Sequence, residues 1–473
     1  MITPRIKALL EYPGDETVYT VQGWVRAFRS NRFIELNDGS CQQNLQLVID
    51  FDQHDAGLLK RITTGSALQA HGKLVTSMGK GQRVELHVSA FEVLGTADPE
   101  LYPLQPKKHS LEFLRDIAHL RPRTNTFGAV FRIRHSLAFA IHKFFNERGF
   151  YYFQSPIITA SDAEGAGEMF RVTTQQAPGS LEKNDFSTDF FGRAVNLTVS
   201  GQLEAELGAM GLGNVYTFGP TFRAENSNTA RHLAEFWMIE PEMAFYDLHD
   251  NMQLAESLLV YLIRYILEQH PEELAFLEQR LLDEEKQKPQ HERSEMRLTQ
   301  KLEFCTTQAF ERVSYTEAIE ILKFAAAHKK KKFQFPVNEW GIDLQSEHER
   351  YLVEQHFKKP VILYNYPKAI KSFYMRQNDD GKTVAAMDIL FPGIGEMVGG
   401  SQREERYEQL STRMKELSIS ETELYWYLDT RKFGSCPHSG FGLGFERMVQ
   451  FVTGMANIRD VIPFPRTPKN CMF

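Results

Sequence analysis

The stretch from 215 to 243, VYTFGPTFRAENSNTARHLAEFWMIEPEM, constrains the fold and function of this chain more than any other. Its apolar runs at 215–218 and 235–239 predict two strands, and Gly219-Pro220 is expected to end the first. The loop and the second strand carry side chains suited to a ligand: Arg223, Glu225, Arg231, His232 and Phe236. Arginine forks bind phosphate oxygens, a carboxylate accepts from an amino group, and an aromatic ring stacks. An anionic ligand with a flat ring fits this hairpin, although such a hairpin, taken alone, is more often a salt-bridged surface feature.

The composition restricts the class of protein. At 473 residues the chain is expected to form two or three domains, and 42% hydrophobic with 24% charged residues is typical of a globular protein. No apolar run predicts a membrane span, and the N-terminus shows no signal-peptide pattern. Four widely spaced cysteines argue against a disulfide framework or structural zinc and suit a reducing cytoplasm. The formal charge of −7 gives no support to nonspecific coating of nucleic acid.

The N-terminal part predicts a small all-β unit. Five alternating apolar runs lie at 17–27, 32–37, 45–51, 66–75 and 83–94. Five strands in so short a segment favour an OB-fold barrel, which commonly binds single-stranded nucleic acid. Candidates for a binding face are Arg26, Arg29, Phe33 and Gln46, which offer cations, an aromatic ring and an amide. From the barrel alone, a core position is the simpler interpretation of Phe33.

A proline-rich segment at 96–125 predicts a hinge with one short helix at 111–120. A helix is expected from Phe127 to Gly149, followed by an aromatic strand at 150–158 that contains Pro156. Such an apolar surface often marks a subunit interface.

Later elements are predicted less sharply. They are a buried helix at 258–267, a charge-dense helix at 272–296, a solvated basic run at 329–332, and strands at 361–364, 372–376 and 383–390. We therefore expect three parts: a domain at 1–100, a linker at 101–126, and a domain at 127–473 with a helical insertion at about 250–335.

Two further motifs predict a site. Asp388 and Glu396 flank a Pro-Gly turn, so that adjacent strands can bring both carboxylates onto one hard cation, and Arg403 follows seven residues later. The run GFGLGFER at 440–447 predicts a glycine strand entering a helix, with a flat floor near Gly444 and Arg447 on the first helical turn. Glycines that merely let a helix pack closely are an equally good interpretation of that run. Neither a Walker loop nor a dinucleotide fingerprint is present.

Taken along the chain, three stretches resemble the three motifs of the class II aminoacyl-tRNA synthetases. They are the helix and strand that end at Pro156, the hairpin with Arg223, and the glycine strand with Arg447. The chain is most similar to their aspartyl, asparaginyl and lysyl subclass, and within it to the asparaginyl branch of bacterial type. The similarity covers essentially the full length and rests on long runs: SDAEGAGEMF at 161–170, TVSGQLEAEL at 198–207, the hairpin, WGIDLQSEHERYL at 340–352, MDILFPGIGEMVGGSQREER at 387–406 and RDVIPFPRTPKN at 459–470. Only residues 270–335 match loosely.

The resemblance implies an α+β protein, with an anticodon-binding OB barrel followed by a catalytic domain on an antiparallel sheet flanked by helices. It implies a homodimer formed through the motif 1 helix and strand around Pro156. The implied substrates are L-asparagine, ATP with Mg²⁺, and tRNA(Asn), which react through an adenylate with release of pyrophosphate.

The resemblance also implies roles for individual residues. Catalysis would rest on Arg223, Glu225 and Arg447. The ATP set is Arg223, Glu225, Arg231, His232, Phe236, Glu396, Gly444 and Arg447, and the metal ligands are Asp388 and Glu396. The amino-acid set is Glu164, Gln202, Ala205 and Arg403. The anticodon set is Arg26, Phe33 and Gln46, which reverses the core interpretation of Phe33.

One position bears on substrate choice. Aspartyl enzymes have a lysine at the place of Ala205, and alanine removes the cation that would pair with an aspartate carboxylate. A neutral amide therefore fits better. The alternatives are an aspartyl enzyme that accepts both tRNAs, an asparagine synthetase on the same fold, and a non-catalytic paralogue. The last of these is expected to have lost motif residues that this chain retains.

Overall fold

The computed structural model describes residues 4–30, 32–50, 52, 54–79, 81–161, 168–175, 186–290, 293–294, 296–328 and 332–473. Glu164 and most of the basic run at 329–332 lie outside these ranges. The chain divides into two compact units, Met1–Arg132 and Ile133–Phe473, which are described separately. Among the described helices, none combines the length and the apolar character needed to cross a membrane.

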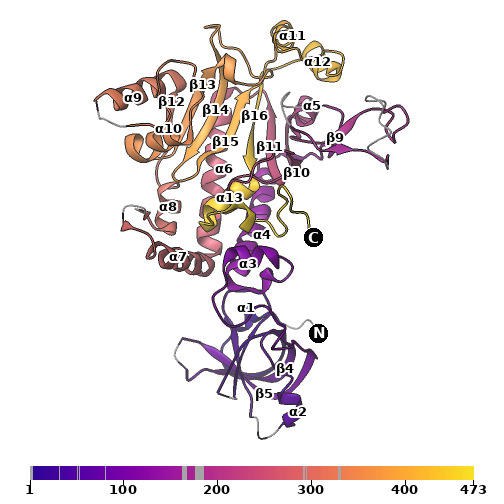
Figure 1. The fold of residues 1–473 in the computed structure, drawn as a ribbon, viewed down its shortest axis with the longest axis vertical. Helices are drawn as coiled ribbons and strands as arrows, with labels where there is room; N and C mark the ends of the chain where they lie inside the picture. The colour runs from indigo at the N-terminus through magenta and orange to yellow at the C-terminus, as the bar shows by residue number, and fades with distance from the viewer. Residues whose placement is uncertain are drawn as a thin grey trace. The chain divides into compact units, whose positions relative to one another are not determined.

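The first unit, coloured indigo to purple in Figure 1, contains a closed five-stranded barrel in the order β1-β2-β3-β5-β4. Its strands are β1 (Asp15–Arg29), β2 (Phe33–Asn37), β3 (Leu45–Val48), β4 (Ala67–Thr76) and β5 (Val84–Gly95). The barrel closes because the long strand β1 pairs with both β2 and β4, with a register shift between Val25 and Ala27 that bends it. Alternate side chains such as Ile34, Leu47 and Leu86 fill the interior. The predicted OB barrel is confirmed.

Short helices accompany the barrel: α1 (Ile6–Leu9), α2 (Ala56–Leu59) and α3 (Leu111–Asp116), with a 3₁₀ turn η2 (Arg121–Arg123). The predicted helix at 111–120 therefore begins where expected but ends early. Ser110 caps its start by accepting from the amide of Phe113, and Ile117 leaves the helical conformation.

The second unit is built on an eight-stranded sheet in the order β12-β13-β14-β15-β16-β11-β10-β6. The strands are β6 (Tyr151–Tyr152), β10 (Asn214–Phe222), β11 (Glu235–Ala244), β12 (Glu311–Ser314), β13 (Val361–Pro367), β14 (Thr383–Phe391), β15 (Gly395–Gln402) and β16 (His438–Gly444). The predicted antiparallel arrangement holds for the centre, while β12–β13 and β10–β6 are parallel pairs at the two ends, so the sheet is mixed. A separate small sheet has the order β7 (Ile158–Thr159), β9 (Val195–Leu197), β8 (Arg171–Val172).

Helices flank the large sheet (Figure 1). They are α4 (Asn125–Asn146), α5 (Gln202–Leu212), α6 (Leu248–Gln269), α7 (Pro271–Glu285), α8 (Leu298–Phe304), α9 (Tyr315–His328), α10 (Ser346–Arg350), α11 (Tyr407–Glu416), α12 (Tyr425–Lys432) and α13 (Phe445–Thr453), with a π-helix η4 (Tyr351–Phe357) and 3₁₀ turns η5 (Lys368–Ile370) and η6 (Ile458–Asp460). Helix α6 packs on β14, β15 and β16 through its apolar stripe, which includes Leu258, Leu262 and Ile266. This packing fixes the strands that carry the site.

Several boundary predictions were wrong. Strand β10 does not stop at Gly219-Pro220 but continues to Phe222, because its β6 neighbour pairs only with Val215 and Tyr216 and the proline needs no donor on that edge. The aromatic strand at 150–158 is two separate two-residue strands, β6 and β7, on either side of Pro156.

Three other segments also differ from expectation. The helix expected to reach residue 296 ends at Glu285, before Pro289, which disfavours a continuing helix. Residues 372–376 form only an isolated bridge, between Met375 and Arg403. The region expected to be a helical insertion contains strand β12, which extends the main sheet.

Candidate active site

A cavity of about 350 Å³ opens beside the β10–β11 hairpin, β15 and the junction of β16 with α13. All eight residues predicted to bind ATP line it: Arg223, Glu225, Arg231, His232, Phe236, Glu396, Gly444 and Arg447. They come from three segments that are far apart in the chain, so the fold brings together what the sequence motifs suggested separately.

The register of the β10–β11 hairpin places the Arg223 guanidinium and the Phe236 ring together in the lining of the cavity. Thr221 pairs with Phe236 and Phe222 with Glu235, and the amide of Arg223 extends the ladder by donating to the Ala234 carbonyl at 3.0 Å. The Arg223 guanidinium carbon lies 5.4 Å from the centre of the Phe236 ring. A planar group entering here meets an aromatic face beside a fixed positive charge.

Polar side chains of the β10–β11 loop surround the same opening. His232 Nε2 lies 4.0 Å from Glu225 Oε2, and the Thr229 hydroxyl contacts His232 Nδ1. Arg231 Nη1 donates to Ser346 Oγ at 3.4 Å. The loop thus places a guanidinium, an imidazole and a carboxylate at the cavity rim.

Helix α13 anchors the opposite wall. Arg447 Nη1 donates to the Glu396 carbonyl oxygen at 2.8 Å. The neighbouring Glu446 is buried and accepts from Arg134 Nη2 at 2.6 Å and from the Trp237 amide at 2.8 Å, which ties the start of α13 to β11. The bond to the Glu396 carbonyl orients the Arg447 side chain, which lines the cavity together with Phe236.

The two predicted metal ligands lie on adjacent strands. In the β14–β15 register Asp388 opposes Gly399, and a Cβ at that glycine would contact Glu396 Oε1 at 3.1 Å and Asp388 Oδ1 at 3.4 Å, so both carboxylates face the same point. Burial raises the pKa of Glu396, Asp388 raises it further, and nearby cations such as Arg447 oppose the shift. A divalent cation would relieve this repulsion.

Sequence reasoning missed two neighbours of these carboxylates. Lys371 Nζ donates to Asp388 Oδ2 at 2.8 Å. Burial, with Glu396 and Asp388 nearby, raises the pKa of Glu349 to about 7. Among the described residues no cluster of three or more His, Cys, Asp or Glu side chains could hold a metal by itself. Mg²⁺ typically takes one or two carboxylates and completes its shell with phosphates and water, so Asp388 and Glu396 fit a cation that arrives with a phosphate ligand.

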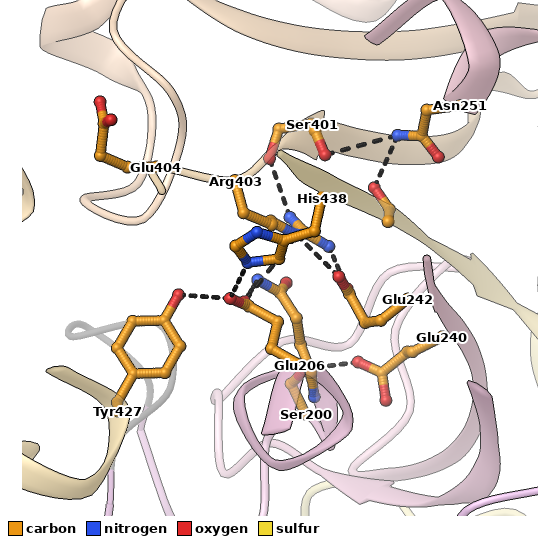
Figure 2. A network of polar contacts seen from close by, with 12 residues as sticks. Ser200, Glu206, Glu240, Glu242, Asn251, Ser401, Arg403, Glu404, Tyr427 and His438 are labelled. Atoms are coloured by element: carbon orange, nitrogen blue, oxygen red, sulfur yellow. Dashed lines mark hydrogen bonds and ion pairs between the residues drawn. The ribbon is translucent and has the colours of Figure 1, made fainter. Parts of the chain in front are cut away.

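A buried cluster of polar side chains surrounds Arg403, as Figure 2 shows. Arg403 Nε donates to Glu242 Oε2 at 3.1 Å, Nη2 contacts Glu242 Oε1, and Nη1 donates to Ser401 Oγ at 2.8 Å. Burial raises the pKa of Glu242, although the Arg403 guanidinium acts against the shift. Space for the Glu242 carboxylate exists because residue 440 is glycine: a Cβ there would overlap both carboxylate oxygens.

A second carboxylate, Glu206 of α5, lies on the other side of Arg403, with 3.8 Å between Arg403 Nε and Glu206 Oε1. Its donors are Tyr427 OH at 2.7 Å, Arg431 Nη2 at 2.7 Å and Gln202 Nε2 at 3.1 Å, the last being a predicted amino-acid ligand. His438 Nε2 is 3.1 Å from the same carboxylate (Figure 2). The arrangement places guanidinium donors and carboxylate acceptors side by side in a buried environment.

The predictions for this pocket were incomplete. Arg403 and Gln202 are brought together, whereas Ala205 is fully buried and packs with Ala209, Val215 and Phe153. The carboxylates Glu206, Glu240 and Glu242 were missed. The sequence signal that could have found two of them is the pair Glu240 and Glu242 in the mostly apolar strand β11. Residues i and i+2 share a face of a strand, so this spacing predicts two carboxylates side by side.

The barrel has its own hollow of about 810 Å³, lined in part by Arg29, Phe33 and Gln46. Gln46 Nε2 donates to Glu85 Oε2 at 2.9 Å, and Glu85 was not predicted although it is the direct partner of Gln46 between β3 and β5. Arg26 is not among the described residues that line the hollow. It is largely buried, and burial lowers its pKa, with Arg132 and Arg123 adding to the effect while Tyr102 opposes it.

Comparisons with known proteins agree with this arrangement. Residues 110–468 match the family model of tRNA synthetases class II (D, K and N), and residues 19–94 match that of the OB-fold nucleic acid binding domain. The chain is 58% identical over 480 residues to the asparagine–tRNA ligase of Cytophaga hutchinsonii, covering 99% of both chains. It is also 58% identical to that of Parabacteroides distasonis, over 99% of this chain and 98% of the relative.

Solved structures are similar over the whole chain. The asparaginyl-tRNA synthetase of Pyrococcus horikoshii complexed with asparaginyl-adenylate superposes with a TM-score of 0.83 at 31% identity, covering all of both chains. The resemblance inferred from the motifs is confirmed, and the chain belongs to the class II tRNA synthetases of the D, K and N group.

Proposed function

We propose that this chain is an ATP-dependent ligase that activates L-asparagine as asparaginyl-adenylate and transfers it to the 3′ end of tRNA(Asn). The observation that carries the proposal is the buried pair of Arg403 and Glu242, which belongs to the same sheet as the cavity lined by Arg223 and Phe236. The pair presents N–H donors next to carboxylate acceptors. A side-chain amide has one oxygen that accepts and one NH₂ that donates, so it matches both.

An aspartate side chain matches this pair poorly. Its carboxylate would meet Arg403, whose charge Glu242 already pairs, and would face the Glu242 carboxylate with no proton to donate. Leaving a buried polar group unpaired costs about 1–3 kcal/mol, and like charges add to that cost. Relatives named asparagine–tRNA ligase at 58% identity support the same choice of substrate.

In the first chemical step the asparagine carboxylate attacks the α-phosphorus of ATP. A carboxylate O–P bond forms, and the bond to the β-phosphate oxygen breaks in line as pyrophosphate leaves. No protein nucleophile is needed: Arg223 stabilises charge on the α-phosphate, Phe236 and Arg447 hold the two faces of the adenine, and His232 and Arg231 lie near the outer phosphates.

Mg²⁺ is assigned to Asp388 and Glu396, where it would neutralise phosphate charge. In the second step the terminal ribose hydroxyl of tRNA attacks the mixed anhydride, and AMP leaves. Glu225, at the exposed rim of the cavity, is assigned to the adenosine or the tRNA 3′ end.

The accompanying assignments are part of the proposal. We propose domains at 1–100, 101–126 and 127–473. Family matches at 19–94 and 110–468 support a barrel followed by a catalytic domain, while the two compact units divide after Arg132. A homodimer would bury the exposed apolar side chains near α4, β6 and β7: Phe139, Tyr151, Tyr152, Ile157 and Ile158. A reducing cytoplasm agrees with four cysteines that are all free.

The direct test is ATP–pyrophosphate exchange by the full chain with Asn, Asp and Lys as separate amino acids. We expect exchange with asparagine, little with aspartate or lysine, and none after Mg²⁺ is removed with a chelator. Comparable exchange with aspartate would instead identify a non-discriminating aspartyl enzyme. Absence of exchange with all three would refute the adenylate chemistry.

The barrel is assigned to the tRNA anticodon, with Phe33 stacking on a base and Gln46 reading its edge, while Arg29 in the same hollow contributes charge in place of Arg26. Phe33→Ala is expected to lower kcat/KM for charging tRNA(Asn) by about 10-fold or more, since base stacking contributes about 1–3 kcal/mol. Asparagine-dependent pyrophosphate exchange should not change, because that step needs no tRNA. Val18→Ala, an exposed apolar position on β1 outside the hollow, is the control and should charge normally.

A further inference from the structure

The buried pocket around Arg403 contains more negative than positive side chains. Glu206, Glu240 and Glu242 are each at most 6% exposed, against the guanidiniums of Arg403 and Arg431 at 2% and 5%. Glu240 is held by Ser200 Oγ, the Gly201 amide and Thr217 Oγ1. Both arginines are already engaged by carboxylates.

Glu206 has the central place among these acids. Its carboxylate joins three elements, because Arg431 and Tyr427 come from α12, His438 from β16, and Glu206 itself from α5. His438 Nδ1 donates to the Cys436 carbonyl at 2.9 Å, which fixes the ring beside the carboxylate. Glu206 therefore forms an ion pair with the Arg431 guanidinium, and its Oε1 lies 3.8 Å from Arg403 Nε.

We propose, on the basis of the asparagine specificity argued above, that Glu206 is a specificity-determining residue that excludes aspartate by saturating the cations of the pocket. With Glu242 on one side of Arg403 and Glu206 on the other, neither guanidinium has positive charge left to pair with a substrate carboxylate. The neutral side-chain amide of asparagine does not require an unpaired positive charge in order to bind. The absence of a lysine at position 205 removes a cation, and Glu206 neutralises those that remain.

The electrostatics of the neighbouring acids agree with this inference. Burial and then Glu206 and Glu240 raise the pKa of Glu242, so that the pocket resists additional negative charge. Burial, followed by the charges of Glu240 and Glu206, raises the pKa of Glu204 to about 6. Glu206 itself has its pKa lowered, because Arg431, His438 and Arg403 outweigh the effect of burial.

A purely structural role for Glu206 predicts something different. A cross-link between α5, α12 and β16 would, when broken, damage the pocket for any amino acid. Activity with asparagine and aspartate would then fall together. Charge saturation instead predicts that the ratio of the two changes, and that its direction follows the sign of the charge removed.

The experiment measures kcat/KM for Asn and for Asp in pyrophosphate exchange by the full chain. Where aspartate is not activated, its inhibition constant against asparagine supplies the same comparison. Glu206→Gln, which keeps the shape and removes the charge, should lower the asparagine-to-aspartate ratio by roughly 10-fold or more, mainly through tighter aspartate binding. Arg431→Met removes a cation from the same contact and should raise the ratio.

Tyr427→Phe is the matched control, because it removes a hydrogen bond to Glu206 without changing any charge. It should keep the wild-type ratio. An unchanged ratio in Glu206→Gln, or equal losses for both substrates in the two charge variants, would overturn the inference. If Glu206→Gln does not fold, a ratio that falls in Arg431→Met overturns it as well. Wild-type protein inactive with asparagine would refute the proposed function instead, which separates the two failures.

Discussion

Arg223→Ala is expected to lower the rate of asparagine-dependent pyrophosphate exchange by at least about 1,000-fold, because an arginine that stabilises a transferring phosphoryl group contributes on that scale. Arg223 extends the β10 ladder and lies against Phe236 in the cavity, so the variant loses a preorganised positive charge. The defect should appear in kcat as much as in KM, since the charge on the α-phosphate grows in the transition state.

A surface arginine provides the comparison. Arg293→Ala removes a guanidinium that donates to the carbonyl groups of Lys286 and Lys288, away from the cavity, and should leave exchange unchanged. Arg223→Lys restores the charge without the fork and should recover only a small part of the activity. Exchange within 10-fold of wild type in Arg223→Ala would show that the assigned cavity is not where the adenylate forms.

Much of the ATP cavity was predictable because each of its walls is formed by a short continuous stretch of the sequence. The hairpin at 215–243, the carboxylates at 388 and 396, and the glycine strand at 440–447 each contain both the fold signal and the functional side chains. Their assembly into one cavity required only that the strands share a sheet. The barrel was predictable for the same reason, since its five alternating runs are separated by turn residues.

The amino-acid pocket was predicted less completely, because its contacts join distant segments. Glu206 and Arg431 are hydrogen-bonded although 225 positions separate them. Glu206 lies in the run TVSGQLEAEL, but nothing in its spacing indicates a partner near residue 431. Lys371 reaches Asp388 from the residue just before 372–376, a segment that was expected to be a strand and forms only an isolated bridge. Pro220 misled the strand assignment because the effect of a proline depends on whether its strand edge is paired. These are properties of tertiary neighbours that periodicity does not encode.

Gly440→Ala is expected to raise the KM for asparagine by about 100-fold or more, while ATP binding is retained. A Cβ at this position overlaps the Glu242 carboxylate, which cannot move away because Arg403 holds both of its oxygens. The backbone cannot retreat either, since Asn251 Nδ2 donates to the Gly440 carbonyl at 2.9 Å. Overpacking of this kind also lowers the free energy of unfolding, by about 1–3 kcal/mol.

The control is Gly219→Ala in β10 of the same sheet, where no atom lies within 4 Å of the added Cβ and the backbone is not left-handed. It should leave the KM for asparagine unchanged. Pyrophosphate exchange gives the KM, calorimetry gives the affinity for ATP, and urea denaturation gives the unfolding free energy. A Gly440→Ala variant that binds ATP and keeps the wild-type KM for asparagine would mean that the Glu242 carboxylate does not contact the substrate amide. A variant that loses ATP and asparagine binding together would point to collapse of the sheet rather than to displacement of one side chain.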